Sequence, residues 1–164
     1  MFHSQALDPD VHRLDALDSG EPTLDAWLSE HARGAEARRV ARTFVWTTED
    51  QTVTAYYSLT GHRIVRDELP KSVGRGSPSE IPAVLLARLA LDKNLHGQGH
   101  GGILLADALE RIVVATQTVA ARVVVVDALH ERAARFYEHY GFKRIPNTLR
   151  LVQKVSDVAA AVKP

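Results

Sequence analysis

The feature that most constrains this chain is a glycine-dense corner between an apolar segment and an amphipathic one. Gly97, Gly99, Gly101 and Gly102 fall within six residues. Because glycine adopts positive φ at little cost and carries no Cβ, the main chain here can approach a ligand closely. The next segment predicts a helix, whose first N–H groups lack intrahelical partners and lie at the positive end of its dipole. The corner therefore predicts a binding site for a phosphate or pyrophosphate.

The segments on either side of the corner have strong hydrophobic patterns. Residues 83–92 are apolar apart from Arg88 and Asp92, and their nearly continuous apolar character predicts a central strand. Apolar residues from Leu105 to Val119 recur at intervals of three and four, which predicts a helix packed on the sheet. Residues 122–126 predict a buried strand, and residues 131–140 predict a helix that ends at Gly141. This order predicts an α/β fold with helices on both faces of a sheet.

The remaining segments have weaker signals. In chain order we expect a short strand or extended arm and a turn over residues 1–22, a helix capped by Thr23, and a β-hairpin over 43–47 and 52–59. A long loop over 62–82 that can hold one helical turn, two closing strands over 142–145 and 149–155, and a flexible tail over 156–164 are also expected. No internal repeat or second domain is evident. We therefore expect one domain over residues 1–155.

Composition excludes several classes of site and partner. The chain has no cysteine, which excludes disulfides, thiolate metal sites and a cysteine nucleophile. The first residues do not have the pattern of a signal peptide, and no apolar run is long enough to span a bilayer. We expect a cytoplasmic protein without a membrane partner. Twenty basic and twenty acidic residues balance, so a nucleic-acid partner would have to bind a local basic patch.

The glycine run has three interpretations. Gly97, Gly99 and Gly102 match G-x-G-x-x-G, but the dinucleotide fingerprint needs an acid about twenty residues on. Asp127, the first acid after the predicted helix, lies too far from the glycines to serve as this acid. Too few residues follow Gly102 for the second half of a doubly wound domain. A turn without a ligand would be a costly use of four glycines. A pyrophosphate loop is the third and favoured interpretation.

Other catalytic and metal-binding patterns are weak. His96 and His100 are four residues apart, but no carboxylate completes a zinc site. His130 and Glu131 do not form H-E-x-x-H, because position 134 is Ala. Composition does not exclude a Ser-His-Asp triad, but no G-x-S-x-G elbow is present. We expect no metal.

Several motifs resemble the GNAT superfamily of acyl-CoA N-acyltransferases, and more closely its TacT-type acetyltransferase toxins. They are LDSGEPTLDAWL (17–28), YYSL (56–59), IPAVLLARLALD (81–92), HGQGHG (96–101), DAL (127–129) and ARFYEHYGFK (134–143). The family loop begins with Gln or Arg, where this chain has His96, and relatives commonly have Cys in place of Ser19. The resemblance implies the GNAT fold, with a mixed and mostly antiparallel sheet.

The resemblance also implies a binding site for acetyl-CoA. In the family, the strand before the loop splays from its neighbour and its main chain pairs with the pantetheine arm. The positions implied for cofactor binding are Leu89, Ala90, Leu91, His96, Gly97, Gln98, Gly99, His100, Gly101, Gly102 and Phe136. By the same resemblance, Tyr137 lies near the thioester sulfur and is the general acid that protonates the departing thiolate.

The sequence contains no evident general base. Asp107, Glu110, Glu131 and the histidines are candidates only by residue type. This absence favours an α-amine as acceptor, because an α-amine with a pKa near 7.7 to 8.0 is partly neutral at physiological pH, whereas a lysine amine with a pKa near 10.4 is not. Such an amine could react through water alone.

The toxin group implies partners and a substrate. Its members acetylate the α-amine of aminoacyl-tRNA and block translation, are homodimers, and are neutralised by a ribbon-helix-helix antitoxin. The arginines that could contact tRNA phosphates are Arg38, Arg39, Arg42, Arg75 and Arg88. A solvated helix face explains the cluster at 38–42 equally well. Two alternatives remain open, namely a GNAT enzyme that acts on a small amine or a protein N-terminus, and a catalytically silent acyl-CoA-binding module.

Overall fold

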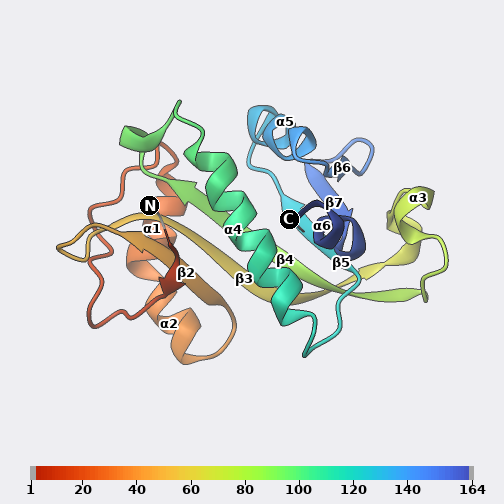
Figure 1. Ribbon diagram of the computed structural model, residues 1–164, viewed down its shortest axis with the longest axis horizontal. Helices are drawn as coiled ribbons and strands as arrows, with labels where there is room; N and C mark the ends of the chain where they lie inside the picture. Colours follow the sequence, from red (N-terminus) through yellow and green to blue (C-terminus); the bar gives the residue numbers. More distant parts are fainter. Residues whose placement is uncertain (1–2, 163–164) are drawn as a thin grey trace. The chain divides into compact units, whose positions relative to one another are not determined.

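The computed structural model describes residues 3–162 (Figure 1). The elements in chain order are β1 (Gln5–Ala6), α1 (Pro22–Glu30), α2 (Ala32–Ala37), β2 (Arg42–Thr47), β3 (Val53–Val65), η1 (Arg66–Glu68), α3 (Lys71–Gly74), β4 (Glu80–Leu91), η2 (Lys93–Leu95), α4 (His100–Ala115), β5 (Val123–Asp127), α5 (Glu131–His139), β6 (Lys143–Arg144), β7 (Arg150–Lys154) and α6 (Val155–Val162). The strands form a seven-stranded sheet in the order β1-β2-β3-β4-β5-β7-β6. The pair β4 and β5 is parallel, whereas β1–β2, β2–β3, β5–β7 and β6–β7 are antiparallel. The prediction of a mixed, mostly antiparallel sheet is confirmed.

The contacts within the chain group it into two compact units. The first comprises residues 1–60 and 87–108, and the second comprises residues 61–86 and 109–164. The strands β3 and β4 run through both. The prediction of a single domain over residues 1–155 stays a prediction.

In the first unit, two neighbouring tyrosines of β3 show which helices cover which face. Successive side chains of a strand point to opposite faces of its sheet. The Tyr56 ring stacks on Trp27 of α1, at 5.9 Å between ring centroids. The Tyr57 hydroxyl donates a hydrogen bond to Asp107 of α4 over 2.6 Å. The helices α1 and α4 therefore cover opposite faces of this part of the sheet, and Leu28 of α1 is fully buried in the core on its side.

In the second unit, β5 is the most buried strand. Its four valines, at positions 123 to 126, are all buried, so both faces of the strand are covered. Val123 and Val125 pack in one cluster with Val73 of α3 and Val152 of β7. A continuous run of β-branched residues suits a strand that is buried on both faces.

Two segments differ from the sequence-based expectation. The prediction of a long loop over residues 62–82 is wrong at both ends, because β3 extends to Val65 and β4 begins at Glu80. The helical turn expected within it is present, as η1 and α3. Ile64 and Ile81 are buried in the second unit, and their burial is what extends the two strands. The expected flexible tail forms the helix α6 up to Val162, with Val158 buried. Residues 163–164 of that tail lie outside the described residues.

No helix within residues 3–162 is both long and apolar enough to cross a membrane.

Candidate functional site

The glycine corner has the backbone geometry that the sequence predicts at two of its four glycines. Gly97 has φ +76° and Gly99 has φ +81°, and a Cβ built on either would meet no protein atom within 4 Å. Gly101 and Gly102 lie in the first turn of α4. The left-handed residues turn the chain into the helix, and the space beside them is open. A ligand can therefore approach the main chain directly.

The backbone amides of the corner point to an anion. Among residues 3–162, the amides of Gly97, Gln98, Gly99, Gly101 and Gly102 donate no hydrogen bond to the protein. The first amide of the turn with a backbone acceptor is that of Ile103, which reaches the Gly99 carbonyl over 3.4 Å. Since α4 runs on to Ala115, its dipole adds positive potential at this end. Backbone amides without a protein acceptor at a helix N-terminus suit a phosphate group.

Asp92, at the end of β4, holds the approach to the corner in place. Its carboxylate accepts hydrogen bonds from the backbone amides of Asn94 over 3.0 Å and of Asp18 over 3.2 Å. The neighbouring Lys93 forms an ion pair with Asp18 over 2.9 Å. These contacts tie the chain before the corner to the segment ahead of α1, so the corner is anchored from outside its own sequence.

The polar side chains of the corner contact the main chain. The His96 ring donates from Nε2 to the Leu91 carbonyl over 2.7 Å, which requires the proton on that nitrogen. The Gln98 side-chain amide donates to the Asn94 carbonyl over 3.2 Å. Both side chains brace the loop, which leaves the backbone amides to bind an anion. The departure from Gln or Arg at position 96 therefore leaves the backbone site intact.

The strand β4 continues beyond its pairing with β5. The parallel ladder runs from Ala83 with Val123 to Leu86 with Val126, whereas β4 itself ends at Leu91. The positions predicted for the pantetheine arm, residues 89–91, lie in this continuation. The Ala90 side chain is buried in the core of the first unit, and the side chains on either side of it are partly buried. Their side chains pack in the protein, so contact with a ligand there would be made by the main chain.

Tyr137 lies on the buried face of α5. It is 7% exposed and packs edge-on against Phe136, at 5.2 Å between ring centroids, and against Phe142, at 5.7 Å. Burial raises the pKa of the Tyr137 phenol well above its ordinary value. The hydroxyl forms no hydrogen bond with any residue in the range 3–162. A buried, protonated phenol with an uncommitted hydroxyl is available to give its proton to a ligand.

Arg144 of β6 holds the helix that carries Tyr137, a role that sequence reasoning missed. Its guanidinium contacts Glu131 over 2.7 Å at the start of α5 and Glu138 over 3.1 Å near its end. The ion pair with Arg144 lowers the pKa of the Glu131 carboxyl. The three residues are spaced along the chain without a recognisable motif, so only the structure reveals this contact.

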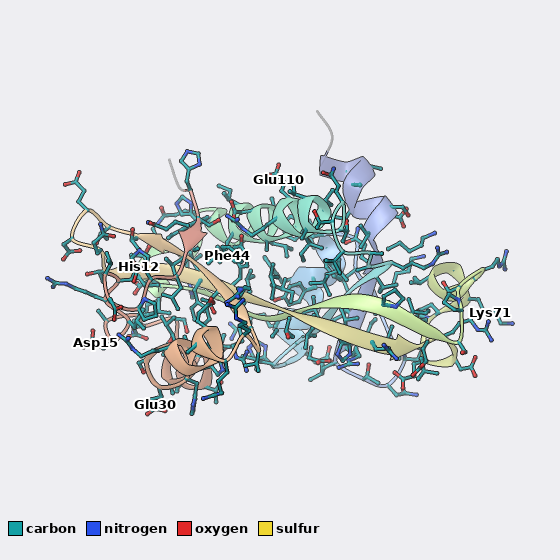
Figure 2. All side chains as sticks on the ribbon, turned by 90° about the horizontal axis from the view of Figure 1, so that it is seen from below. His12, Asp15, Glu30, Phe44, Lys71 and Glu110 are labelled. Carbon is teal, nitrogen blue, oxygen red and sulfur yellow. The ribbon has the colours of Figure 1, made fainter. Side chains whose placement is uncertain are left out.

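The three carboxylates considered as general bases by residue type differ in their surroundings. Asp107 accepts hydrogen bonds from Tyr57 and from Ser4, and Glu131 is paired with Arg144. Glu110 is exposed on the outer side of α4 (Figure 2). Two of these carboxylates are thus engaged in structural contacts, and the structure identifies none of the three as a base.

The arginines predicted to contact tRNA have three kinds of environment. Arg38, Arg39 and Arg75 are exposed and form no ion pair within the described chain. Arg42 is paired with Glu36 over 3.0 Å. Arg88 is partly buried in the first unit, where its guanidinium carbon lies 3.9 Å from the centroid of the Trp27 ring. The predicted group is therefore not one uniform patch.

The predicted site residues are distributed over both units. The first unit holds the glycine corner, the end of β4 and the arginines at positions 38, 39, 42 and 88, while the second holds Phe136, Tyr137 and Arg75. Within each unit the geometry is as described above. Among residues 3–162, no group of three or more His, Cys, Asp or Glu side chains is arranged to hold a metal ion.

Comparison with known proteins identifies relatives over nearly the whole chain. A family model described as "Acetyltransferase (GNAT) domain" matches residues 40–144. The tRNA-acetylating toxin of Mycobacterium tuberculosis is 34% identical over 154 residues, which are 93% of this chain and 92% of that protein. The probable toxin TacT of Sinorhizobium fredii is 30% identical over 87% of this chain and 84% of its own length.

Solved structures with the same fold include toxins bound to ligands. The toxin AtaT complexed with acetyl-methionyl-tRNAfMet has a TM-score of 0.90 and 29% identity, covering 99% of this chain and 100% of that one. A mutant of AtaT bound to the C-terminus of the antitoxin AtaR and to acetyl-CoA has a TM-score of 0.84 and 27% identity, with 99% of each chain covered.

Proposed function

We propose that this chain, which belongs to the GNAT acetyltransferase family, is a toxin that acetylates the α-amine of aminoacyl-tRNA. The resemblance found in the sequence is thereby confirmed at the level of family and fold. The chain is an acetyl-CoA-dependent acetyltransferase. The proposal adds the acceptor, the residues that carry the reaction, and the partners.

The observation that carries the proposal is the set of unpaired backbone amides at the start of α4. Amides of this kind suit the pyrophosphate of coenzyme A, and His96 and Gln98 leave them unobstructed. The part of β4 beyond its ladder with β5 ends shortly before the corner, and it offers main chain to the pantetheine arm. Both features belong to the first unit, so one unit supplies the features proposed for binding acetyl-CoA.

In the proposed reaction, Tyr137 acts as general acid. The neutral α-amine attacks the thioester carbonyl, a C–N bond forms, the C–S bond breaks, and the thiolate takes the phenol proton. The proton released by the amine passes to water, because no base is evident, and the Tyr137 phenolate regains a proton from water. An ordinary phenol has a pKa near 10, about 1.5 above that of a thiol. Burial raises the pKa of Tyr137 further, so efficient transfer requires that the thiolate be desolvated as well.

The choice of aminoacyl-tRNA rests on the relatives and on the amine. The Mycobacterium tuberculosis relative is named a tRNA-acetylating toxin, and AtaT is solved with an acetylated aminoacyl-tRNA. A weakly basic α-amine needs no dedicated base. The exposed Arg38, Arg39 and Arg75 provide positive charge for an RNA backbone.

We also propose that the toxin is a homodimer neutralised by a ribbon-helix-helix antitoxin. AtaT is solved with the antitoxin AtaR, which supports an antitoxin partner for this chain. Light scattering would measure the mass of the purified chain alone and with the product of the neighbouring gene. A monomer in solution would reject the dimer.

The decisive experiment is acetyl transfer from labelled acetyl-CoA to total charged tRNA. We expect the label on the aminoacyl group, with loss of transfer in Tyr137→Phe and retained binding of acetyl-CoA by calorimetry. Transfer to a polyamine or a peptide N-terminus but not to charged tRNA would favour the small-amine alternative. Binding of acetyl-CoA without transfer to any of these acceptors would identify a silent acyl-CoA-binding module.

A further inference from the structure

We propose that Arg88 binds a phosphate at the acceptor end of the substrate RNA, with Trp27 as the positioning residue that orients its guanidinium. This inference rests on the proposed function and adds a specific contact to it. It separates Arg88 from the exposed arginines, which act through general charge.

The Arg88 guanidinium is held in place, yet it has no charged partner. It lies over the Trp27 ring, with 3.9 Å from its central carbon to the ring centroid. Within the described part of the chain, its one side-chain hydrogen bond is to the Ser58 hydroxyl over 3.4 Å, which is long for such a bond. Among residues 3–162, no carboxylate lies within ion-pair distance of it. Most of its five N–H donors therefore remain available.

An unpaired guanidinium in this position has a cost. Arg88 is partly buried, and burial lowers its pKa, which means that its charged form has lost solvation. An arginine is rarely buried without a carboxylate partner. Two arginines of the first unit have such a partner, namely Arg33 with Asp10 over 2.9 Å and Arg42 with Glu36 over 3.0 Å, whereas Arg38 and Arg39, unpaired within the described chain, are exposed to solvent. A ligand anion would restore the missing pairing at Arg88.

The surroundings fix Trp27 in turn. Its indole also stacks on Tyr56 of β3, whose ring is inclined by 13° to that of Trp27, with 5.9 Å between centroids. The Tyr56 hydroxyl donates to the Leu24 carbonyl of α1 over 2.6 Å. The indole is therefore held by its own helix and by β3, and a guanidinium stacked on it loses little further freedom when it binds a ligand.

The location of Arg88 indicates which anion it meets. Arg88 directly precedes the β4 residues proposed for the pantetheine arm, residues 89–91. The glycine corner follows shortly after the end of that strand. The phosphates of coenzyme A are assigned to the amides of the corner, so Arg88 is left for the second substrate. A planar fork of N–H donors matches a phosphodiester. We therefore expect Arg88 to bind the phosphate that lies nearest the aminoacyl group of the RNA.

The test compares two acceptors that differ in their phosphates. Initial rates are measured for aminoacyl-tRNA and for the same amino acid esterified to adenosine without phosphate, with wild type, Arg88→Gln, Arg88→Lys and the control Arg33→Gln. We expect Arg88→Gln to reduce kcat/KM for tRNA by about 10- to 100-fold, with a much smaller loss on the adenosine ester. Arg88→Lys should retain part of the tRNA activity, since it keeps the charge but loses the fork. Arg33→Gln should match wild type on both acceptors.

A second readout is the salt dependence of binding to uncharged tRNA. Loss of one phosphate contact on a single strand should reduce the slope of log K against log salt by about 0.7. Trp27→Leu should weaken tRNA binding without that change of slope, because the charge remains. Equal losses of Arg88→Gln on both acceptors, or an unchanged slope, would overturn the role of Arg88 alone. A wild type that binds acetyl-CoA but leaves charged tRNA unmodified would overturn the proposed function and this inference with it.

Discussion

Buried tyrosines occur in two regions, and they differ in one respect. Tyr56 and Tyr57 of β3 are fully buried, as Tyr137 of α5 nearly is. Burial raises the pKa of Tyr56 and of Tyr137 alike. The hydroxyl of Tyr56 donates to the Leu24 carbonyl and that of Tyr57 to the Asp107 carboxylate, each over 2.6 Å. The Tyr137 hydroxyl has no such partner among the described residues.

This contrast shows that a raised pKa does not by itself mark a catalytic phenol. Desolvation perturbs the pKa of any buried tyrosine, whatever its role. What distinguishes Tyr137 is that its proton is uncommitted within the protein. The Tyr137 side chain is 7% exposed, and its hydroxyl is not one of the fully buried polar atoms without a partner in the described chain, so a ligand can reach it.

The largest effect is expected from Tyr137→Phe. The loss of a general acid costs about 10² to 10⁴ in kcat. The fold should be unaffected, because the aromatic packing against Phe136 and Phe142 is retained. Single-turnover acetylation of charged tRNA measures the loss, and calorimetry should give the acetyl-CoA affinity of wild type.

The matched control is Tyr56→Phe. It removes a hydroxyl whose proton the protein already uses, so we expect a loss of about 1 kcal/mol of stability with kcat near that of wild type. If Tyr56→Phe lowered kcat as much as Tyr137→Phe, hydrogen-bond commitment would not separate structural from catalytic tyrosines in this fold.

The next largest effect separates binding from proton transfer. A methyl group at Gly99 would meet no protein atom, so in the proposed site it would meet the bound phosphates. We expect Gly99→Ala to weaken acetyl-CoA binding by about tenfold or more, a change of about 1.4 kcal/mol, with a rise in KM for acetyl-CoA. Gly76→Ala is the control, because Gly76 also has a positive φ, +78°, and open surroundings. An equal loss of affinity in both variants would attribute the effect to backbone strain.

The sequence predicts the parts of this structure that depend on local patterns. The apolar run before the corner is the strand β4, the periodic segment after it is the helix α4, and the valine run is the buried strand β5. The extension of β3 and β4 into residues 62–82 was not predicted, because the prolines and glycines of this segment indicate a loop. Two isoleucines, Ile64 and Ile81, were the opposing signal. Their burial depends on the packing of distant strands.

Contacts between residues far apart in the chain could not be predicted from the sequence. The stacking of Arg88 on Trp27 joins positions on α1 and β4, and no spacing rule links them. An arginine inside the apolar run of residues 83–92 was the one signal available. The sequence also could not predict that the Tyr137 hydroxyl has no hydrogen-bond partner among the described residues, because this depends on which acceptors the fold brings near it.

A smaller effect is expected from loosening the helix that carries Tyr137. Arg144→Gln removes the ion pairs with Glu131 and Glu138, so α5 should hold the phenol less firmly. We expect kcat to fall by about 2- to 10-fold, in line with a small misplacement of a catalytic group, while KM for acetyl-CoA is retained. Arg63→Gln is the control, because Arg63 forms an exposed ion pair with Glu80 away from α5. A fall in kcat for both variants would point to general loss of charge.

The smallest effect is expected in the pH profile, and it tests the state of the phenol directly. The acceptor must lose a proton, so kcat/KM should rise with pH and level off above the α-amine pKa, about 7.7 to 8.0. The general acid must keep its proton, and burial raises the pKa of Tyr137, which moves any alkaline fall in rate above the ordinary phenol pKa of about 10. Initial rates on charged tRNA should therefore be level from about pH 8.5 to 10. A fall below about pH 9.5 would indicate an acid with a pKa lower than that of a buried phenol, and Tyr137 would then be a packed aromatic residue like those of β3.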